Sequence, residues 1–347
     1  MIKNPRVQKL MSDSEIAYIS NGDERMKVLI TGVAGFIGSH LARRLLKDVQ
    51  EVWGVDNFLA GKADRIEDLM SNKSFHFMEG DLCDFRFVKK VFEKEKFERV
   101  WHLAANMGGI GYISRVGADI MRDNLRMNIN MLEASVEAGV ARFFFSSSAC
   151  IYPVEKQTSL GVVPLKEEDA YPANPDSFYG WEKLTTEKMC AAYCEDYGLE
   201  TRIARFHNCY GPMADYGDEK GKVIACLIRK AIRYPKERFV VWGDGRQERS
   251  FIYIDDLVDA LLRLMRSDYS KPLNIGTDRL ISVSDLAEMI IKLSGKEIRI
   301  GYDLSKPQGV RSRNADLTLI KRILGWTPKV SLEEGVRRTF EWLSSVL

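Results

Sequence analysis

The chain has 347 residues, enough to bury a large core as one domain or two closely packed ones. Its 51 basic and 49 acidic residues nearly cancel to a net charge of +2, so neither nucleic acid nor an anionic membrane is expected as a partner. No apolar run reaches the roughly 20 residues that a membrane-spanning helix needs.

The cysteines and histidines give no sign of a metal or disulfide framework. The six cysteines are scattered without a CxxC pair, and the four histidines stand far apart, without partners at metal-ligand spacing. No signal peptide is recognisable. We therefore expect a cytoplasmic protein with free thiols and no metal. Residues 1–25 are polar and mixed in charge, and we expect an arm outside the core, with the folded part beginning near Met26.

The first strongly patterned stretch is a strand followed by a glycine-rich turn. Residues 27–31 are β-prone and lead directly into GxxGxxG, formed by Gly32, Gly35 and Gly38, and then into a predicted helix over residues 36–47. Such glycines permit a tight turn, close approach of a pyrophosphate, and close packing of the helix on the strand. The helix N-terminus supplies amides and partial positive charge for phosphates.

The next predicted strand, residues 51–55, is followed by Asp56. A carboxylate at this place binds the ribose hydroxyls of adenosine and repels a 2′-phosphate, so NAD is favoured over NADP. Strand, glycine turn, helix and acidic residue together predict a Rossmann-type NAD site. The residues expected to contact the cofactor are Gly32, Gly35, Phe36, Ile37, Gly38, Asp56, Asn57, Asp81, Leu82, Leu103, Ala104, Ala105, Tyr179 and Lys183.

The alternation of strands and helices continues with predicted strands at residues 74–78 and 98–103. Asp81 follows the first of them and either meets the adenine or caps the next helix, and the sequence leaves both readings open. After the second strand, the small residues Ala104 and Ala105 let a dinucleotide lie over the strand end, where open α/β sheets bind ligands.

Residues 107–113 are too glycine-rich for a helix and too apolar for a linker. We expect a substrate loop here, with a plain connecting turn as the alternative. A long helix is predicted over residues 117–138, and Asn124 in its middle is expected to act as a hydrogen-bonded spacer near the active strands.

The catalytic candidates follow a buried strand predicted at residues 142–148. Ser147 or Ser148 at its end can hydrogen-bond a reacting oxygen. Cys150 adds a second proton carrier at the same strand end, with a buried structural thiol as the alternative reading. These residues indicate a catalytic site only together with the residues of the next predicted helix.

That helix is predicted to be capped by Ser177 and carries Tyr179 and Lys183 one turn apart on one face. The ammonium is expected to lower the pKa of the phenol, which otherwise titrates near about 10, so that it acts as a base near neutrality. Alone, a Y-x-x-x-K pattern also occurs on ordinary amphipathic helices.

The second half carries several further polar candidates. A strand over residues 200–205 leads to His207, expected to be structural, and to Asn208, expected to face a substrate phosphate. Arg311 and Arg313 share a loop that suits forked phosphate contacts. Further predicted features are a basic loop over 213–223 leading into a helix, a helix from the cap residues Asp255 and Asp256 to about 265, and a last helix over 332–343.

Taken in chain order, GxxGxxG, Asp56, LAA at 103–105, Ser148 and the Tyr179/Lys183 pair resemble the extended short-chain dehydrogenases that act on nucleotide sugars. The sequence WGDGRQERSF at 242–251 strengthens the resemblance, which spans about 26–345. It implies an α/β fold: a Rossmann-type doubly wound parallel sheet over residues 26–205, with a smaller, interleaved C-terminal substrate-binding domain over mainly 206–347.

Within that superfamily, ANMGGIG at 105–111, SSACIYP at 147–153, RFHNCYGP at 205–212 and GVRSRN at 309–314 are similar to the GDP-mannose 3,5-epimerases. The resemblance implies an NAD-dependent homodimer that acts on a GDP-hexose and moves protons with a cysteine and a lysine. By position these are Cys150 and Lys222. Because residues 217–221 depart from the family pattern, Lys220 stays an alternative candidate for the acid. The implied substrate contacts are Met107, Gly108, Gly109, Asn208, Lys222, Lys230, Gln247, Arg249 and Arg311.

The alternatives are another nucleotide-sugar epimerase, acting at C4 or on a GDP-linked heptose or hexose, and a non-catalytic NAD-binding protein. A 4-epimerase needs only a ketone and rotation of the sugar, which would leave a thiol at position 150 idle. A 4,6-dehydratase would be expected to carry an Asp-Glu pair where this chain has Ala149 and Cys150, and a non-catalytic protein would be expected to lose Tyr179 or Lys183. Whether C3, C5 or both carbons invert stays open.

Overall fold

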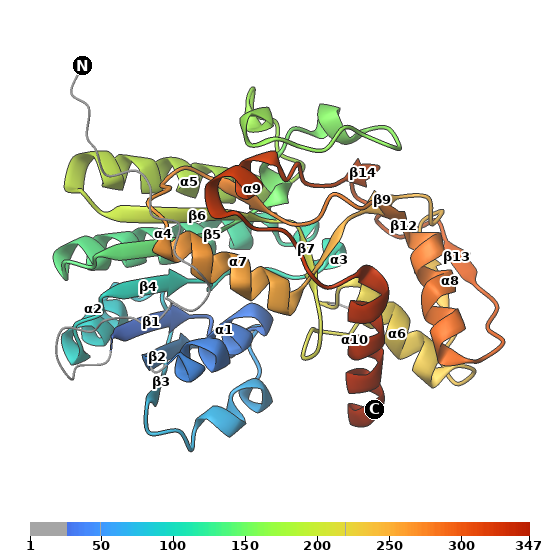
Figure 1. Cartoon of the computed structure of the whole chain (residues 1–347), viewed down its shortest axis with the longest axis horizontal. Helices are drawn as coiled ribbons and strands as arrows, with labels where there is room; N and C mark the ends of the chain where they lie inside the picture. Colours follow the sequence, from blue (N-terminus) through green and yellow to red (C-terminus); the bar gives the residue numbers. More distant parts are fainter. Residues whose placement is uncertain (1–25, 49, 219) are drawn as a thin grey trace.

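The computed structural model describes residues 26–48, 50–218 and 220–347, so the predicted arm over 1–25 lies outside the described residues. Two parts stand side by side, a large sheet with helices on both faces and a smaller group of helices and short strands (Figure 1). Within the described ranges, no helix is long and apolar enough to cross a membrane.

Seven parallel strands form the large sheet in the order β11-β6-β5-β4-β1-β2-β3, which confirms the predicted Rossmann-type α/β fold. Runs such as Phe143-Phe144-Phe145 are fully buried, as expected for parallel strands covered on both faces. The strands are β1 (Lys27–Thr31), β2 (Glu51–Asp56), β3 (Phe75–Glu79), β4 (Arg99–His102), β5 (Arg142–Ser148), β6 (Glu200–Phe206) and β11 (Leu273–Ile275).

Two separate cores sandwich this sheet. Val28 and Ile30 belong to one core and Leu29 to the other, because successive side chains of a strand point to opposite faces. The first core packs under α1 (Phe36–Lys47) and α7 (Ile254–Arg266), and the second under α2 (Phe85–Lys94), α4 (Gly117–Glu137) and α5 (Phe178–Tyr197). The predicted helix over 36–47 is confirmed, as is Ser177 as the N-cap of α5, where its hydroxyl accepts a hydrogen bond from the Gly180 amide.

The smaller part contains helices α6 (Val223–Arg233), α8 (Val283–Ser294) and α10 (Leu332–Val346), whereas α9 (Thr318–Leu324) packs on β11 and α7 beside the large sheet (Figure 1). Its short strands pair as β7 (Asn208–Tyr210) with β10 (Phe251–Tyr253), as β8 (Val240–Trp242) with β13 (Gly301–Asp303), and as β12 (Ile281–Ser282), β9 (Glu248–Arg249) and β14 (Ser312–Arg313). Strand β11 and helix α7 return to the large sheet from this half of the chain, and the proposed boundary at residue 205 stays a prediction.

Short helices occupy several connections: α3 (Ile110–Ile113) and the 3₁₀ turns η1 (Ala63–Arg65), η2 (Glu67–Leu69), η3 (Ala149–Ile151), η4 (Val154–Gln157) and η5 (Glu167–Ala170).

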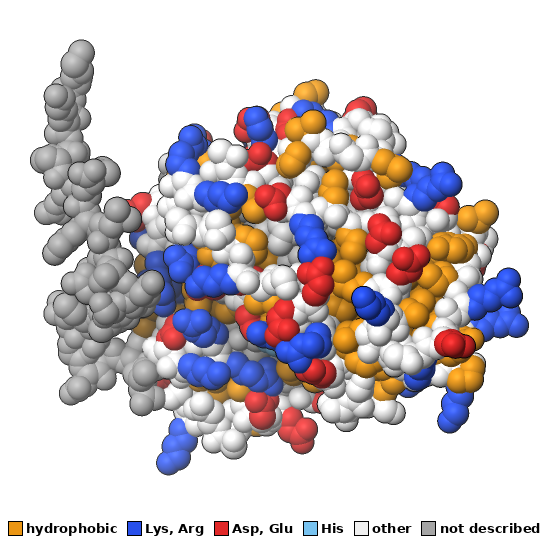
Figure 2. Space-filling view, turned by 45° about the vertical axis from the view of Figure 1, so that its right-hand side comes forward, with side chains coloured by type: hydrophobic (Ala, Val, Ile, Leu, Met, Phe, Trp, Pro, Cys, Tyr) orange, Lys and Arg blue, Asp and Glu red, His pale blue; other side chains and the backbone are white. Residues whose placement is uncertain are grey.

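Figure 2 shows the face over the smaller part, where Lys and Arg side chains lie next to Asp and Glu side chains with hydrophobic side chains between them.

Two local predictions are wrong. The stretch 107–113 contains the one-turn helix α3, which is possible because Gly109 stands at its N-cap, where glycine is tolerated. Helix α7 is not capped by Asp255 and Asp256, since it begins at Ile254 after Tyr253. The Asp256 carboxylate instead accepts hydrogen bonds from the amides of Lys329 and Val330, just before α10, at 3.0 and 2.8 Å.

Candidate functional site

The turn between β1 and α1 packs directly against the end of β4. Gly32 has φ +69°, and a Cβ at this position would lie 2.9 Å from the backbone of Ala104. A Cβ at Gly38 would lie 2.2 Å from the Gly32 carbonyl oxygen, so only glycine lets α1 sit this close to the strand. The predicted backbone roles of these two glycines are therefore confirmed.

The carboxyl ends of the large sheet open on a cavity of about 1000 Å³. This is the place where open α/β sheets bind ligands. Every residue predicted to contact the cofactor lines the cavity, and so do Ser148, Cys150, Lys222 and its rival Lys220. The predicted substrate residues also line it, with the exception of Arg311.

Asp56 at the end of β2 has a fixed orientation. Its carboxylate accepts hydrogen bonds from the amides of Ala34 and Phe58 at 3.0 and 2.9 Å, and burial raises its pKa while these amides oppose the rise. A Cβ at Gly61 would come within 2.6 Å of this carboxylate, so glycine keeps the space beside it open. This cradle fits the ribose of NAD.

Asp81 lines the same cavity and accepts a hydrogen bond from the Cys83 amide at 2.9 Å. The N-cap of α2 is Asp84, whose side chain accepts from the Arg86 amide, so the capping alternative for Asp81 is wrong.

Tyr179 and Lys183 lie on one face of α5, with the ammonium 5.6 Å from the centroid of the tyrosine ring. The expected lowering of the phenol's pKa is not found. Burial, followed by the charges of Glu182 and Cys150, raises the pKa of Tyr179 well above its ordinary value, and a hydrogen bond with Ser148 opposes the rise only in part. The Lys183 ammonium forms an ion pair with Glu182, whose carboxylate acts on the phenol in the opposite sense.

Glu182 belongs to a buried polar network that the sequence did not reveal. Its oxygens accept hydrogen bonds from the side-chain amides of Asn124 and Asn128 at 2.8 and 3.3 Å, and burial raises its pKa. Asn124 in turn accepts from the Asn106 amide at 2.6 Å. The expectation of a hydrogen-bonded spacer at Asn124 is confirmed, because it joins α4 to α5 and to the loop after β4.

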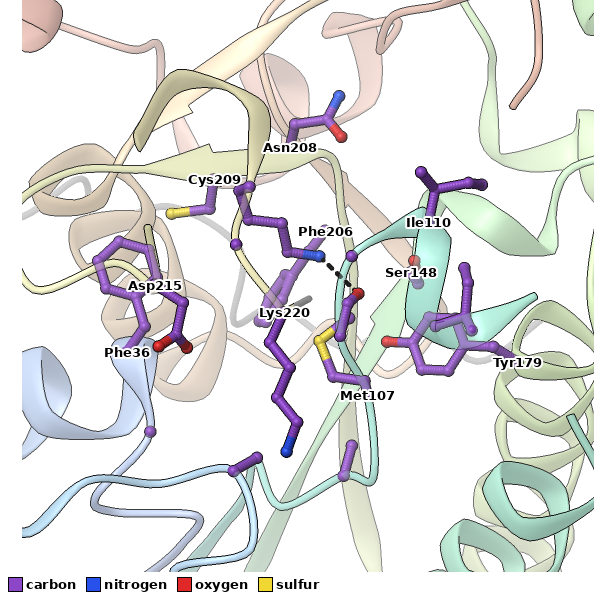
Figure 3. Close-up of a pocket in the computed structure, with 18 of the residues that line it drawn as sticks. Phe36, Met107, Ile110, Ser148, Tyr179, Phe206, Asn208, Cys209, Asp215 and Lys220 are labelled. Carbon is purple, nitrogen blue, oxygen red and sulfur yellow. Dashed lines mark hydrogen bonds between the residues drawn. The ribbon is translucent and has the colours of Figure 1, made fainter. Parts of the chain in front are cut away.

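The two serines at the end of β5 differ in their partners. Ser147 donates to Glu187 at 2.5 Å, and Glu187 also pairs with Arg205 inside the protein. Ser148 accepts from the Cys150 amide at 3.1 Å and hydrogen-bonds Tyr179. Both serines line the cavity, but Ser148 is the one that hydrogen-bonds the tyrosine, and the two side chains lie near one another in Figure 3.

Lys222 stands at the N-cap of α6 and donates from Nζ to the Gly108 carbonyl at 3.1 Å. Its side chain is open to the cavity but surrounded by protein, and burial lowers its pKa, while negative charge on Cys150 and Asp215 raises it. Lys220 instead donates to the Leu59 carbonyl at 2.8 Å and extends away from Ser148 and Tyr179 (Figure 3).

The segment that carries Lys222 is anchored to the residues after β2. Asp215 forms ion pairs with Lys62 and Arg65 at 2.9 and 3.1 Å, and Arg65 also donates to the Met213 carbonyl at 2.9 Å. Asp215 and Arg65 both line the cavity.

The polar residues that were predicted to contact the substrate mostly donate hydrogen bonds to backbone carbonyls. Asn208 donates to the Ser250 carbonyl and Lys230 to the Val240 carbonyl, at 3.0 and 2.7 Å. Arg249 donates to the Val310 carbonyl at 2.7 Å. Gln247 donates to the Trp242 carbonyl at 2.9 Å, while its buried Oε1 has no partner within the described residues.

The two loop arginines are placed differently. Arg311 forms a forked ion pair with Asp244 at 3.0 and 2.9 Å and does not line the cavity, so its role in substrate binding stays a prediction. Arg313 lines the cavity and donates to the Cys150 sulfur at 3.3 Å, and its predicted phosphate contact stays a prediction. His207 is buried, lies 3.4 Å from the Asn274 side chain, and has its pKa lowered to about 3 by burial, which fits the expected structural role.

Comparisons with known proteins agree with this geometry. Residues 28–276 match the model of the NAD dependent epimerase/dehydratase family. The chain is 43% identical to GDP-mannose 3,5-epimerase of Arabidopsis thaliana over 321 residues, which cover 92% of this chain and 82% of that protein. It is 31% identical to UDP-glucuronic acid decarboxylase 1 of Xenopus tropicalis, over 96% of this chain and 75% of that protein.

Among solved structures, UDP-glucose 4-epimerase of Thermotoga maritima with UDP-glucose has a TM-score of 0.84 at 32% identity and covers 92% of this chain and 99% of that one. UDP-glucuronic acid 4-epimerase of Bacillus cereus, in complex with UDP-glucuronic acid and NAD, has a TM-score of 0.81 at 26% identity, covering 93% of this chain and all of that one.

Proposed function

The chain belongs to the NAD-dependent epimerase/dehydratase family of nucleotide-sugar enzymes, and from that premise we propose that it is a GDP-mannose 3,5-epimerase. The observation that carries the proposal is the presence of Cys150 and Lys222 in one cavity with Tyr179. Inversion at a carbon needs two proton carriers, because one base that returns its own proton tends to restore the starting configuration.

The oxidation step uses the wall of the cavity built from β5 and α5. When bound, NAD⁺ supplies a hydride acceptor and a positive charge beside the sugar. Tyr179 needs such positive charge to take the proton of the C4 hydroxyl, because burial, Glu182 and Cys150 raise the pKa of the phenol. Ser148, which hydrogen-bonds Tyr179, also binds the C4 oxygen and keeps it in line with the phenol.

The inversion step uses the thiol and the amine. A ketone at C4 acidifies the protons on C3 and C5, and Cys150 removes one of them. Lys222 returns a proton to the same carbon from the opposite face, and its lowered pKa favours this donation near neutrality. Return of the hydride to C4, with a proton from Tyr179 to the oxygen, restores the hydroxyl and makes the overall reaction an isomerisation. Lys220 is the weaker candidate for the acid because its ammonium is bound to the Leu59 carbonyl.

The direct test is incubation with GDP-mannose in D₂O, followed by NMR of the sugar. We expect deuterium at C3 and C5 and inversion at these carbons. Cys150→Ala is expected to abolish deuterium uptake while transient reduction of the cofactor remains. Inversion at C4 without deuterium uptake would assign the protein to the 4-epimerases instead, and persisting uptake in Cys150→Ala would remove the thiol from the mechanism.

The enzyme acts as a cytoplasmic homodimer in this proposal. Support for the dimer comes from α4 and α5, which pack side by side and expose large apolar side chains: Ile129 is 41% exposed, Phe178 61% and Trp181 38%. Phe178 lies against Gly117 at the start of α4, where an added Cβ would come within 2.6 Å of the ring, so the two helices offer one continuous surface.

A further inference from the structure

Arg313 reaches from β14 to the end of β5, and each part of its guanidinium has a different partner. Nη1 donates to the sulfur of Cys150 at 3.3 Å, and Nη2 donates to Asp176 at 2.7 Å. Nε donates to the buried side chain of Gln157. The side chain is only 8% exposed, and these contacts fix its position and its orientation.

Asp176 connects this guanidinium to the helix that carries Tyr179. It directly precedes the N-cap residue Ser177, whose hydroxyl donates to the second oxygen of Asp176 at 2.9 Å. The arginine thus touches the thiol on one side and, through Asp176, the beginning of α5 on the other. Cys150 and Tyr179 are held relative to one another by this chain of contacts.

The charge of Arg313 decides what the contact does to the thiol. Guanidinium stays protonated in proteins, so the sulfur accepts a hydrogen bond from a permanent cation. Charge-assisted hydrogen bonds of this kind stabilise a negative acceptor more than a neutral one, and the thiolate is the form of cysteine that takes up a proton. Lys222, Arg249 and Tyr179 line the same cavity as Cys150, and Asp176 balances part of the arginine's charge.

We propose that Arg313 is a positioning residue that aims the Cys150 sulfur into the cavity and stabilises the negative charge that develops on it. The inference rests on the proposed function and adds a third residue to it, one that sets the position and reactivity of the sulfur. A purely structural Arg313, which only ties β14 to β5 and α5, would stabilise the fold without changing the reactivity of the thiol.

Alkylation of Cys150 by iodoacetamide separates these two roles without any substrate. The thiolate is the reacting form, and peptide mass mapping follows Cys150 beside the five other cysteines as internal references. In Arg313→Gln, Cys150 alkylation at neutral pH is expected to slow by about tenfold or more, the size of a lost charge-assisted hydrogen bond. Arg313→Lys is expected to keep part of the rate, and added guanidinium ion to restore part of it in Arg313→Ala.

The matched control is Arg202→Gln, which removes another buried arginine, one that pairs with Glu200 away from the cavity. It is expected to lower stability without slowing Cys150 alkylation. Equal alkylation rates in the wild type and Arg313→Gln would overturn the proposal. If Arg313→Gln does not fold, Arg313→Lys and Asp176→Asn, which loosen the same guanidinium, replace it, and unchanged rates in both would overturn it equally.

With GDP-mannose in D₂O, Arg313→Gln is expected to lose deuterium uptake at C3 and C5 in proportion to the lost alkylation rate, while cofactor reduction at C4 continues. A wild-type protein that takes up no deuterium would refute the proposed function. The alkylation result would still decide whether Arg313 controls the thiol, so the two failures are distinguishable.

Discussion

The ammonium of Lys183 lies 3.6 Å from the carboxylate of Glu182, its neighbour in sequence, and both side chains are buried. Two charges inside a protein are tolerated only when further hydrogen bonds complete the pair. Asn124 and Asn128 supply them, both from α4. The charge of Lys183 beside the phenol therefore depends on a carboxylate and on two amides of the neighbouring helix.

Replacing Glu182 by Gln should destabilise the fold strongly. The change leaves the Lys183 cation without a counter-charge. It also replaces a carboxylate oxygen, which accepts from Asn124 or Asn128, by an NH₂ group that cannot accept. We expect the free energy of unfolding to fall by about 3–5 kcal/mol, measured by urea denaturation. Glu195→Gln, at an exposed position of the same helix, is the control and is expected to change it by less than about 0.5 kcal/mol. A similar small change in Glu182→Gln would contradict this account.

Lys222→Met and Lys220→Met form a matched pair. Removing the Lys222 ammonium takes away the proposed proton donor, so the rate of inversion should fall by about 10²–10⁴-fold. Removing Lys220 breaks a hydrogen bond to Leu59 on the other side of the cavity, and most of the rate should remain. NMR of the sugar product after timed incubation measures both. The reverse order of effects would assign the acid role to Lys220.

Tyr179→Phe is expected to stop the oxidation at C4 while leaving the cofactor site intact. The phenol is the group proposed to exchange the C4 hydroxyl proton, and its loss should slow cofactor reduction by about 10²–10⁴-fold. The ultraviolet absorbance of reduced nicotinamide follows this step, and calorimetric titration with NAD checks that binding is kept. Cofactor reduction at the wild-type rate would exclude Tyr179 as the proton carrier.

Acid should weaken the fold through two buried histidines. Burial lowers the pKa of His102 and of His207 to about 3 each, below the value of roughly 6.5 for an unfolded histidine. Between these values only the unfolded chain gains protons, so the stability present above about pH 6.5 is lost as the pH falls. Each histidine is expected to contribute about 2 kcal/mol to the loss between pH 7 and pH 5.

Urea denaturation at several pH values measures this slope. His102→Gln and His207→Gln should each flatten it relative to the wild type, whatever they do to stability at neutral pH. An unchanged slope in both variants would mean that other groups cause the acid sensitivity.

Trp181→Glu should break the proposed dimer. A carboxylate in the middle of the exposed surface of α4 and α5 cannot be desolvated without a partner. Light scattering after size exclusion is expected to show a monomer, while the wild type runs as a dimer. Tyr302→Glu, which changes an exposed tyrosine on β13 in the smaller part, is the control and should leave the dimer intact. A wild-type protein that is monomeric at micromolar concentration would refute the dimer.

The sequence predicted the elements whose signals are local. The run over 27–31 and the glycines after it define β1 and the turn into α1, and Ser177 marks the start of α5. Asp56 and Ser148 were predicted at strand ends from their position along the pattern, and both line the cavity.

What the sequence could not provide were contacts between distant segments. Arg311 and Arg313 were expected to make forked phosphate contacts because they share a loop, and only the fold shows that Arg313 also contacts Cys150. The pKa of Tyr179 was expected to fall because Lys183 shares its helix face, yet burial and Glu182 outweigh that proximity. Burial is a property of the whole packed structure, and a spacing of four residues carries no information about it.

The ion pairs of Asp215 with Lys62 and Arg65 make the two halves of the protein interdependent. If the chain were cut near residue 205, one fragment would carry the glycine turn and Asp56, and the other would carry Lys222. Each fragment would then lack the residues with which the other lines the cavity. Mixing such fragments should restore turnover only when they reassociate, and added salt should hinder that step because the joining charges are partly exposed.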